Sequence, residues 1–234
     1  MTRSNRLPSD GGFEAVFFDL DGTLVDTAPD MVAIMANMQD ARQQQQLPYE
    51  VARNGVSNGA LELLRLGFPR ANDDELQILL AEYLDSYRNA LCVNTEVFSP
   101  LRDLLNIFTR NGLAWGIVTN KPQRMTDPLL EQLDIARHAA CTISGDTLAE
   151  RKPHPAPLLH AANLAGVAPE NSVYVGDAAR DIEAGRAAGM ATVAAGYGYI
   201  NDADDPNEWG ADVYAADTME LMSLLLRAVG LDNE

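Results

Sequence analysis

The sequence predicts an α/β fold, and two observations lead to this prediction. Short apolar runs alternate with amphipathic stretches from about residue 98 onward, which is typical of parallel strands joined by helices. Residues 26–97 hold only helical patterns, although a strand-like run precedes them. We therefore expect a Rossmann-like parallel sheet core with helices on both faces, formed by residues 13–25 and 98–234. A small all-helical domain is inserted at 26–97.

The composition is that of a globular protein with an acidic surface. The chain has 234 residues, 47% of them hydrophobic and 22% charged, with a formal net charge of −17. No cluster of lysine and arginine stands out, which argues against a nucleic-acid partner and against binding to anionic lipid. No apolar run approaches the roughly 18 residues of a membrane span. We expect no membrane partner.

The ends and the cysteines favour a cytoplasmic protein. Residues 1–12 are polar and lack the apolar stretch of a signal peptide, so we expect a flexible tail there. Cys92 and Cys141 lack the spacing of a zinc site and lie in mainly apolar surroundings. They are expected to be buried free thiols, as in a reducing compartment.

The first element is the apolar run at residues 15–18, short enough for a strand that is buried on both faces. Asp19 and Asp21 follow it, and then a Gly-Thr turn. Because residues i and i+2 of an extended chain point the same way, both carboxylates leave the strand on one side. Their repulsion calls for a divalent cation or a shared proton. Taken alone, these residues also fit an ordinary surface turn.

The inserted stretch predicts two helices with a loop between them. The first helix is capped at residues 26–27 and carries an apolar stripe through Met38. A Gly-rich polar loop is expected at residues 53–59. A long helix then begins at Asn72 and carries its own apolar stripe as far as Tyr87.

The remaining chain alternates between helices and strands. Ser99 is expected to cap a helix that has Pro100 at its first position, and Gly112 fits the position just after that helix. Further helices are expected between the strands and at the end of the chain. The expected strands are residues 113–118, 141–144, 172–175, 190–195 and a short one around Val213.

Polar motifs follow the apolar strands or lie in the loops that lead to the next helix. In a parallel sheet, ligands bind beyond the carboxyl ends of the strands, where such motifs meet. We therefore expect one site built from Asp19, Asp21, Thr119, Asn120, Lys152, Asp177 and Asp181.

These residue types suit the hydrolysis of a phosphate monoester. One carboxylate can act as the nucleophile and form an aspartyl-phosphate, while a second acts as acid and then as base. Mg²⁺ prefers oxygen ligands and binds through carboxylates together with substrate phosphate. Thr119 offers a hydroxyl beside a helix start, and Lys152 offers a positive charge. Each motif alone also fits a structural role, but their fixed order favours a catalytic site.

The order Asp-x-Asp-Gly-Thr, Thr-Asn, Lys-Pro and Gly-Asp-x-x-x-Asp resembles the haloacid dehalogenase-like hydrolase superfamily. The resemblance covers nearly the whole chain after residue 12. It is closest to the phosphoglycolate phosphatase branch and extends to the N-acetylmuramic acid 6-phosphate phosphatases. The segments that carry this closer likeness are residues 118–122, 152–155, 196–199 and 209–212.

The resemblance implies a role for each acidic residue. Asp19 would be the nucleophile and a Mg²⁺ ligand, and Asp21 would be the general acid/base whose backbone carbonyl binds the metal. Asp177 would be the third metal contact, and Asp181 would support it. The residue after Asp177 is Ala178, whereas this branch often has a polar residue there. A polar side-chain contact from this position to the metal site is therefore absent.

The resemblance also implies how the substrate is held. Thr119, with Asn120 beside it, would orient the phosphoryl oxygens, and Lys152 would balance their charge. Residues 26–97 would form a lid over the substrate. Its polar residues Arg53, Ser57 and Asn58 would set the substrate choice.

Several alternatives stay open at this stage. Asp21 argues against a dehalogenase, and the absence of lysine from residues 26–97 argues against a phosphonate hydrolase that needs a lid lysine. A sugar phosphomutase shares all four motifs, and a non-catalytic module on the same fold is a further alternative. We expect a phosphatase for a small phosphorylated metabolite of the phosphoglycolate type, with N-acetylmuramate 6-phosphate as the alternative. The protein could be a monomer or a homodimer.

Overall fold

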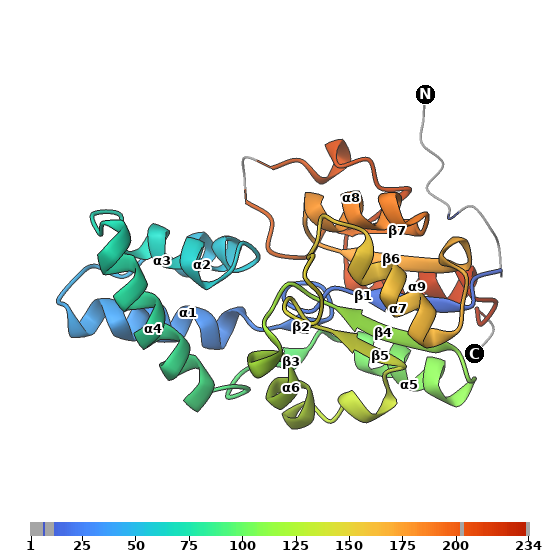
Figure 1. Ribbon diagram of the computed structural model, residues 1–234, viewed down its shortest axis with the longest axis horizontal. Helices are drawn as coiled ribbons and strands as arrows, with labels where there is room; N and C mark the ends of the chain where they lie inside the picture. The colour runs from blue at the N-terminus through green and yellow to red at the C-terminus, as the bar shows by residue number, and fades with distance from the viewer. Residues whose placement is uncertain (1–6, 8–11, 202–203, 233–234) are drawn as a thin grey trace.

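The computed structural model describes residues 7, 12–201 and 204–232. Six parallel strands form one sheet in the order β5-β4-β1-β6-β7-β8 (Figure 1). The strands are β1 (Ala15–Phe18), β4 (Ala114–Val118), β5 (Cys141–Ile143), β6 (Ser172–Gly176), β7 (Ala191–Ala195) and β8 (Val213–Ala215). The predicted parallel sheet is confirmed, with β1 at its centre.

Helices cover both faces of this sheet, as the sequence predicts. They are α5 (Leu101–Arg110), α6 (Gln123–Gln132), α7 (Ala156–Ala165), α8 (Ala179–Ala188) and α9 (Thr218–Ala228). Alternate residues of β1 serve the two faces. Val16 and Phe18 belong to the apolar cluster shared with α5, α6 and α9, whereas Phe17 belongs to the cluster shared with α7 and α8. This alternation explains why the whole of β1 is apolar.

Residues 26–97, here called the helical insert, form a separate group of helices beside the sheet (Figure 1). These are α1 (Ala28–Ala41), α2 (Tyr49–Val56), α3 (Ala60–Gly67) and α4 (Asp73–Asn89). They share an apolar cluster of their own, to which the sheet domain adds only Met125 and Tyr199 among its buried members. The cap of α4 is as expected, because Asn72 and Glu75 bond reciprocally at its start.

The structure corrects the sequence interpretation of the insert in two places. Residues 53–56 belong to helix α2 and not to a loop, because Ala52 and Val56 are buried on one side of a helical turn. Two-residue strands β2 (Val25–Asp26) and β3 (Glu96–Val97) pair antiparallel where the insert joins the sheet domain. Strands this short leave no periodic pattern in a sequence.

Two predicted helix caps also differ in detail. Thr27 occupies the position before α1, but its hydroxyl makes no cap and donates to Asp21 instead. Pro100, not Ser99, is the N-cap of α5, while Gly112 lies just beyond that helix with φ of 69° as expected. Short 3₁₀ helices that the sequence did not reveal lie at η1 (Ala136–His138), η2 (Pro169–Asn171) and η3 (Pro206–Glu208).

The predicted tail at residues 1–12 falls mostly outside the described residues. Of that stretch only Leu7 and Gly12 are described, and Leu7 is buried against the main core. Both cysteines are free thiols; Cys141 is buried, and Cys92 only partly so. Among the described residues, no helix combines the length and the apolar character needed to cross a bilayer.

Candidate active site

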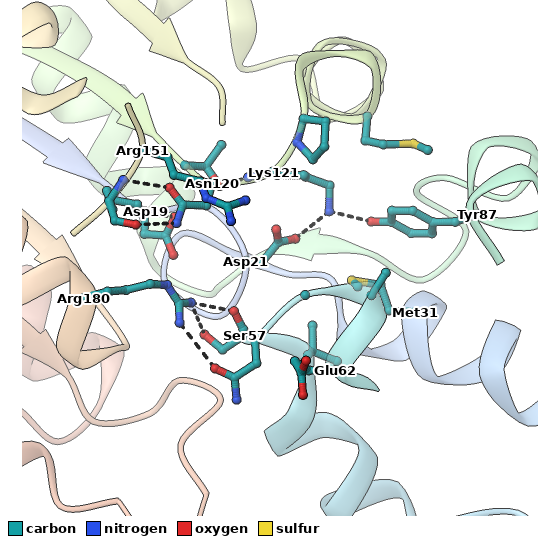
Figure 2. A pocket seen from close by; sticks show the side chains of 18 of the residues that line it. Asp19, Asp21, Met31, Ser57, Glu62, Tyr87, Asn120, Lys121, Arg151 and Arg180 are labelled. Carbon is teal, nitrogen blue, oxygen red and sulfur yellow. Dashed lines mark hydrogen bonds and ion pairs between the residues drawn. The ribbon is translucent and has the colours of Figure 1, made fainter. Parts of the chain in front are cut away.

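A cavity of about 560 Å³ lies at the carboxyl ends of the central strands, between the sheet domain and the helical insert. Figure 2 shows residues of both parts facing it. The sheet domain contributes Asp19, Asp21, Thr119, Asn120, Lys121, Arg151, Lys152 and Arg180, and the insert contributes Met31, Ser57, Asn58, Glu62 and Tyr87 among others. The convergence at one sheet edge is what the strand order predicts.

Asp19 is held by a buried lysine. The Nζ of Lys152 lies 2.8 Å from Oδ1 of Asp19, 2.7 Å from Oδ1 of Asp181 and 2.8 Å from the hydroxyl of Tyr174. It also donates to the carbonyl of Val118 at 2.9 Å. Burial by itself lowers the pKa of Lys152, but the two carboxylates outweigh it and raise that pKa above its usual value. Lys152 therefore stays charged and balances the carboxylates around it.

Asp21 is held in a similar way by a second lysine. The Nζ of Lys121 lies 2.8 Å from Oδ1 of Asp21 and 3.0 Å from the hydroxyl of Tyr87 (Figure 2). Thr27 donates to the same Asp21 oxygen at 2.7 Å. Burial alone lowers the pKa of Lys121. Asp21 and Tyr87 together have a larger effect in the opposite direction, so the pKa of Lys121 lies above its usual value. Lys121 and Lys152 are the only lysines of the whole chain, and each pairs with one aspartate of the first motif.

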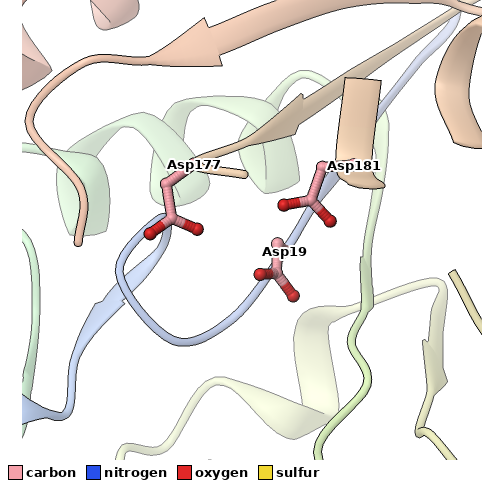
Figure 3. A group of neighbouring side chains, drawn as sticks. All are labelled: Asp19, Asp177 and Asp181. Carbon is pink, nitrogen blue, oxygen red and sulfur yellow. The ribbon is translucent and has the colours of Figure 1, made fainter. Parts of the chain in front are cut away.

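Asp19, Asp177 and Asp181 form a group of buried carboxylates (Figure 3). One oxygen of each lies within 4.8 Å of the others. Burial, together with the charges of Asp19 and Asp181, raises the pKa of Asp177 to about 7. The sequence prediction gave Asp181 a role in supporting the metal ligand Asp177. In the structure its carboxylate is itself a member of the three-carboxylate group. The side chain of Asp21 lies outside the group.

The donors of this group fit a divalent cation. All are carboxylate oxygens, the ligands that hard cations such as Mg²⁺ prefer. Oδ2 of Asp181 accepts from the backbone N–H of Ala178 at 3.1 Å. Its buried Oδ1 lies 2.7 Å from the ammonium of Lys152 and accepts no other hydrogen bond from the residues that the structure describes. The three carboxylates carry more negative charge than Lys152 and Arg180 together balance, and a cation would offset the rest.

Glycines allow the backbone to lie against the carboxylate of Asp177. Gly22 adopts φ of 84°, and a Cβ there or at Gly198 would collide with Asp177. Two donors beside these glycines orient the carboxylate: the N–H of Tyr199 at 2.9 Å and the hydroxyl of Thr23 at 3.2 Å. The Gly-Thr turn after Asp21 therefore fixes Asp177, which is 154 positions away from Thr23.

Thr119 and Asn120 line the cavity next to Asp19. Thr119 is buried, and its Oγ1 accepts from the N–H of Lys121 at 3.1 Å. The amide of Asn120 bonds twice to the backbone of Lys152, donating to its carbonyl at 2.9 Å and accepting from its N–H at 3.1 Å. Asn120 thus fixes the position of Lys152 while it faces the cavity.

The three polar residues expected from the insert lie in different places. Ser57 and Asn58 line the cavity, and the Ser57 hydroxyl donates to Oδ2 of Asp177 at 3.2 Å. Arg53 does not line it. Its guanidinium donates to the carbonyls of Tyr197 and Gly198 at 3.0 Å each, and so ties α2 to the loop after β7.

Sequence reasoning counted Lys121 among the cations that can face a phosphate but gave it no further role, and it did not include Arg180. Arg180 donates to the backbone carbonyl of Ser57 and, at 3.4 Å, to the side chain of Asn58 (Figure 2). Burial lowers the pKa of Arg180, but Asp181 and Asp19 raise it above its usual value. Lys121 directly follows the Thr-Asn motif, and Arg180 lies inside the Gly-Asp-x-x-x-Asp motif. This position in the sequence could have identified both as site residues.

The parallel sheet carries carboxylates and a buried lysine at one strand end, an arrangement that suits phosphoryl transfer. The family model described as haloacid dehalogenase-like hydrolase matches residues 16–195. The chain belongs to this family, as its motifs led us to expect.

Relatives of similar length are phosphatases. The chain is 39% identical over 217 residues to the N-acetylmuramic acid 6-phosphate phosphatase of Pseudomonas aeruginosa, covering 92% of this chain and 96% of the relative. It is 45% identical over 199 residues to the phosphoglycolate phosphatase of Xanthomonas campestris, covering 85% and 90%. The crystal structure of a predicted phosphoglycolate phosphatase from Haemophilus somnus superposes with a TM-score of 0.81 at 26% identity, covering 92% of this chain and 98% of that one. The chain is a phosphatase, that is, a phosphoric monoester hydrolase, and phosphatases of this family use a divalent metal.

Proposed function

We propose that this protein is a Mg²⁺-dependent phosphatase that hydrolyses a small phosphorylated metabolite through an aspartyl-phosphate on Asp19. The observation that carries the proposal is the position of Asp19 at the end of β1. It belongs to the three-carboxylate group and is paired with Lys152 at 2.8 Å. A carboxylate held this way is fixed in place as a nucleophile.

We propose that Asp19 and Asp177 hold the metal together with the backbone carbonyl of Asp21, and that the carboxylate of Asp181, which belongs to the same group, supports them. When bound, Mg²⁺ supplies the positive charge that neutralises the phosphoryl oxygens. The protein supplies the rest of the charge through Lys152, and the Thr119 hydroxyl binds a phosphoryl oxygen.

Asp21 is proposed to move the proton in both halves of the reaction. In the first half, a bond forms between Asp19 and phosphorus, the ester bond breaks, and the leaving oxygen takes a proton from Asp21. In the second half, Asp21 takes a proton from the water that attacks the phosphoenzyme. The proposal is supported by the place of Asp21 in the cavity wall, beside Asp19 in the sequence.

The size of the cavity supports a sugar phosphate as the substrate. Its volume of about 560 Å³ lies in the ordinary range of small-molecule sites and leaves room for more than a two-carbon ester. The wall provided by the insert is mainly apolar and aromatic, and Glu62 is the one charged residue that the described insert adds to the lining. We propose a hexose-sized substrate of the kind named for the Pseudomonas aeruginosa relative, N-acetylmuramate 6-phosphate.

Phosphoglycolate, named for the Xanthomonas campestris relative, is the second candidate. The observation in its favour is that Arg180 also lines the cavity. Its guanidinium could pair with the carboxylate of a short substrate.

Two further parts of the proposal concern the whole molecule. We propose that the helical insert acts as a lid, which is supported by the bonds of Arg53 and Arg180 between insert and sheet domain. We also propose a cytoplasmic location, supported by the free thiols Cys92 and Cys141.

The test compares phosphate release from the two esters in the presence of Mg²⁺. We expect kcat/KM for N-acetylmuramate 6-phosphate to exceed that for phosphoglycolate by a hundredfold or more, about 2.7 kcal/mol of transition-state discrimination. The opposite preference would reassign the substrate to phosphoglycolate. No Mg²⁺-dependent release from either ester would contradict the proposed substrate class.

A further inference from the structure

Asp21 and the helical insert are joined through one side chain. Lys121 follows Thr119 and Asn120 in the loop after β4, and its side chain is only 7% exposed. Its Nζ bonds to Asp21 on the sheet domain and to the hydroxyl of Tyr87 on α4, and it lies 4.8 Å from the centre of the Tyr87 ring. The ammonium is therefore held between two partners, Asp21 of the sheet domain and Tyr87 of the insert.

The contacts of Asp21 leave one of its oxygens available. Thr27 and Lys121 both donate to Oδ1, at 2.7 and 2.8 Å. Among the described residues, Oδ2 of Asp21 receives no hydrogen bond from another side chain, although Asp21 lines the cavity. When one carboxylate oxygen is held by two donors, the orientation of the other oxygen is fixed as well. That second oxygen, Oδ2, is then the one that can exchange a proton with a ligand in the cavity.

Lys121 is poorly placed to act as a simple phosphate ligand. The phosphoryl site at Asp19 already has Lys152, whose Nζ touches Asp19 directly. Lys121 instead makes its ion pair with Asp21 and its hydrogen bond with Tyr87, and both contacts would have to break for it to reach a substrate oxygen.

We propose that Lys121 is a positioning residue for Asp21, which it holds in line with the leaving oxygen of the substrate, and that Tyr87 of the insert holds Lys121 in turn. This inference rests on the proposed acid/base role of Asp21. On this inference the loop after β4 contributes to the proton transfer through Lys121. Helix α4 contributes indirectly, because its Tyr87 bonds to Lys121.

The leaving group distinguishes this role from a merely structural one. When the ester bond breaks, its electron pair stays on the leaving oxygen. An alkyl oxygen must take the proton of Asp21, whereas p-nitrophenolate is stable without it. A loss of proton transfer therefore slows alkyl esters far more than p-nitrophenyl phosphate.

The experiment measures kcat/KM with Mg²⁺ for both substrate types, because kcat/KM reports the steps up to phosphoryl transfer to Asp19. The alkyl ester is whichever of N-acetylmuramate 6-phosphate and phosphoglycolate the wild-type protein prefers. The variants are Lys121→Met, Lys121→Arg and Asp21→Asn, together with the double variant Lys121→Met/Asp21→Asn. Arg151→Met is the matched control, since Arg151 is another cation of the cavity wall without a bond to Asp21.

We expect Lys121→Met to lower kcat/KM for the alkyl ester by about 10- to 100-fold more than for p-nitrophenyl phosphate, within the range of acid catalysis. Lys121→Arg should recover part of this loss. In the Asp21→Asn background, Lys121→Met should add little, because both changes remove the same function. Arg151→Met should change both substrates to the same extent.

Equal losses for both substrates in Lys121→Met, or full additivity with Asp21→Asn, would overturn the inference and leave Lys121 a structural or substrate-binding residue. Failure of the proposed function is distinguishable, because the wild-type protein would then release no phosphate from the alkyl ester. Circular dichroism of each variant checks that it is folded.

Discussion

Asp19 and Asp21 stand two positions apart in the chain, yet their partners come from different regions of the molecule. Asp19 belongs to what we call the core triad, Asp19–Lys152–Tyr174, in which the tyrosine lies on β6 of the sheet. Asp21 belongs to the junction triad, Asp21–Lys121–Tyr87, in which the tyrosine lies on α4 of the insert. Each lysine also lies against the ring of its tyrosine, at 5.5 and 4.8 Å from the ring centre.

The two triads use the same residue types in different surroundings. The side chain of Lys152 is 1% exposed and that of Asp19 is 6% exposed, against 7% for Lys121 and 17% for Asp21. The core triad lies wholly within the sheet domain and is joined by a second carboxylate, Asp181. The junction triad depends on how the insert sits on the sheet domain. The difference suits the proposed roles, since a nucleophile must stay in place and an acid/base must meet a bound substrate.

The largest expected effect separates the two aspartates. Asp19→Asn should lower phosphate release by about 10⁴-fold or more, since no other group can form the phosphoenzyme. Asp21→Asn should still transfer the phosphoryl group from p-nitrophenyl phosphate to Asp19. The measurement is a burst of p-nitrophenol with each variant. Release at a near wild-type rate by Asp19→Asn would show that the nucleophile is assigned to the wrong residue.

Removing the metal should act on the core triad. We expect EDTA to abolish turnover and added Mg²⁺ to restore it, because Asp19 and Asp177 would hold the ion, and Lys152 and Arg180 leave part of the charge of the three carboxylates unbalanced. The check is phosphate release before and after metal is restored. Full activity in EDTA would contradict the mechanism.

The lysines should differ in what they contribute to stability. Lys152→Met leaves Asp19 and Asp181 buried without their cation, so the free energy of unfolding should fall by about 3–5 kcal/mol. Lys121→Met leaves the more exposed Asp21 unpaired and should cost about 1–2 kcal/mol. Urea unfolding of both variants in one buffer gives the comparison. Equal losses would mean that burial does not distinguish the triads.

The smallest effects are expected from the tyrosine hydroxyls. Tyr174 donates to the Val118 carbonyl at 2.8 Å and accepts from Lys152, so Tyr174→Phe should cost about 1–2 kcal/mol of stability. Tyr87→Phe keeps the ring above Lys121 and should cost about 1 kcal/mol or less, with a kcat/KM change of a few-fold for alkyl esters. Thermal unfolding together with rate measurements tests both. A larger stability loss for Tyr87→Phe would reverse the comparison.

The two triads also show which features a sequence can reveal. Asp19, Lys152 and Asp177 were found because each belongs to a motif beside an apolar strand, and parallel strands bring their ends together. The sheet and its helices were found for the same reason, since periodicity marks long elements well.

Contacts across the chain left no such signal. Tyr87 and Lys121 are 34 positions apart, and Arg53 and Gly198 are 145 apart, so nothing local links them. The polar residues of α2 resembled a loop because only Ala52, Gly55 and Val56 are buried in that short helix. The position of Arg53 follows from packing between the insert and the sheet domain, which a single sequence does not encode as a local pattern.

The scarcity of lysine gives this protein a built-in spectroscopic reporter. With Lys121 and Lys152 as its only lysines, a protein labelled with ¹³C at the lysine ε-carbon would show two side-chain signals, one from each triad. The Lys121→Arg variant would assign them. Titration with Mg²⁺ and then with a substrate analogue would record, in solution, the order in which the surroundings of Lys152 and of Lys121 respond to the two ligands.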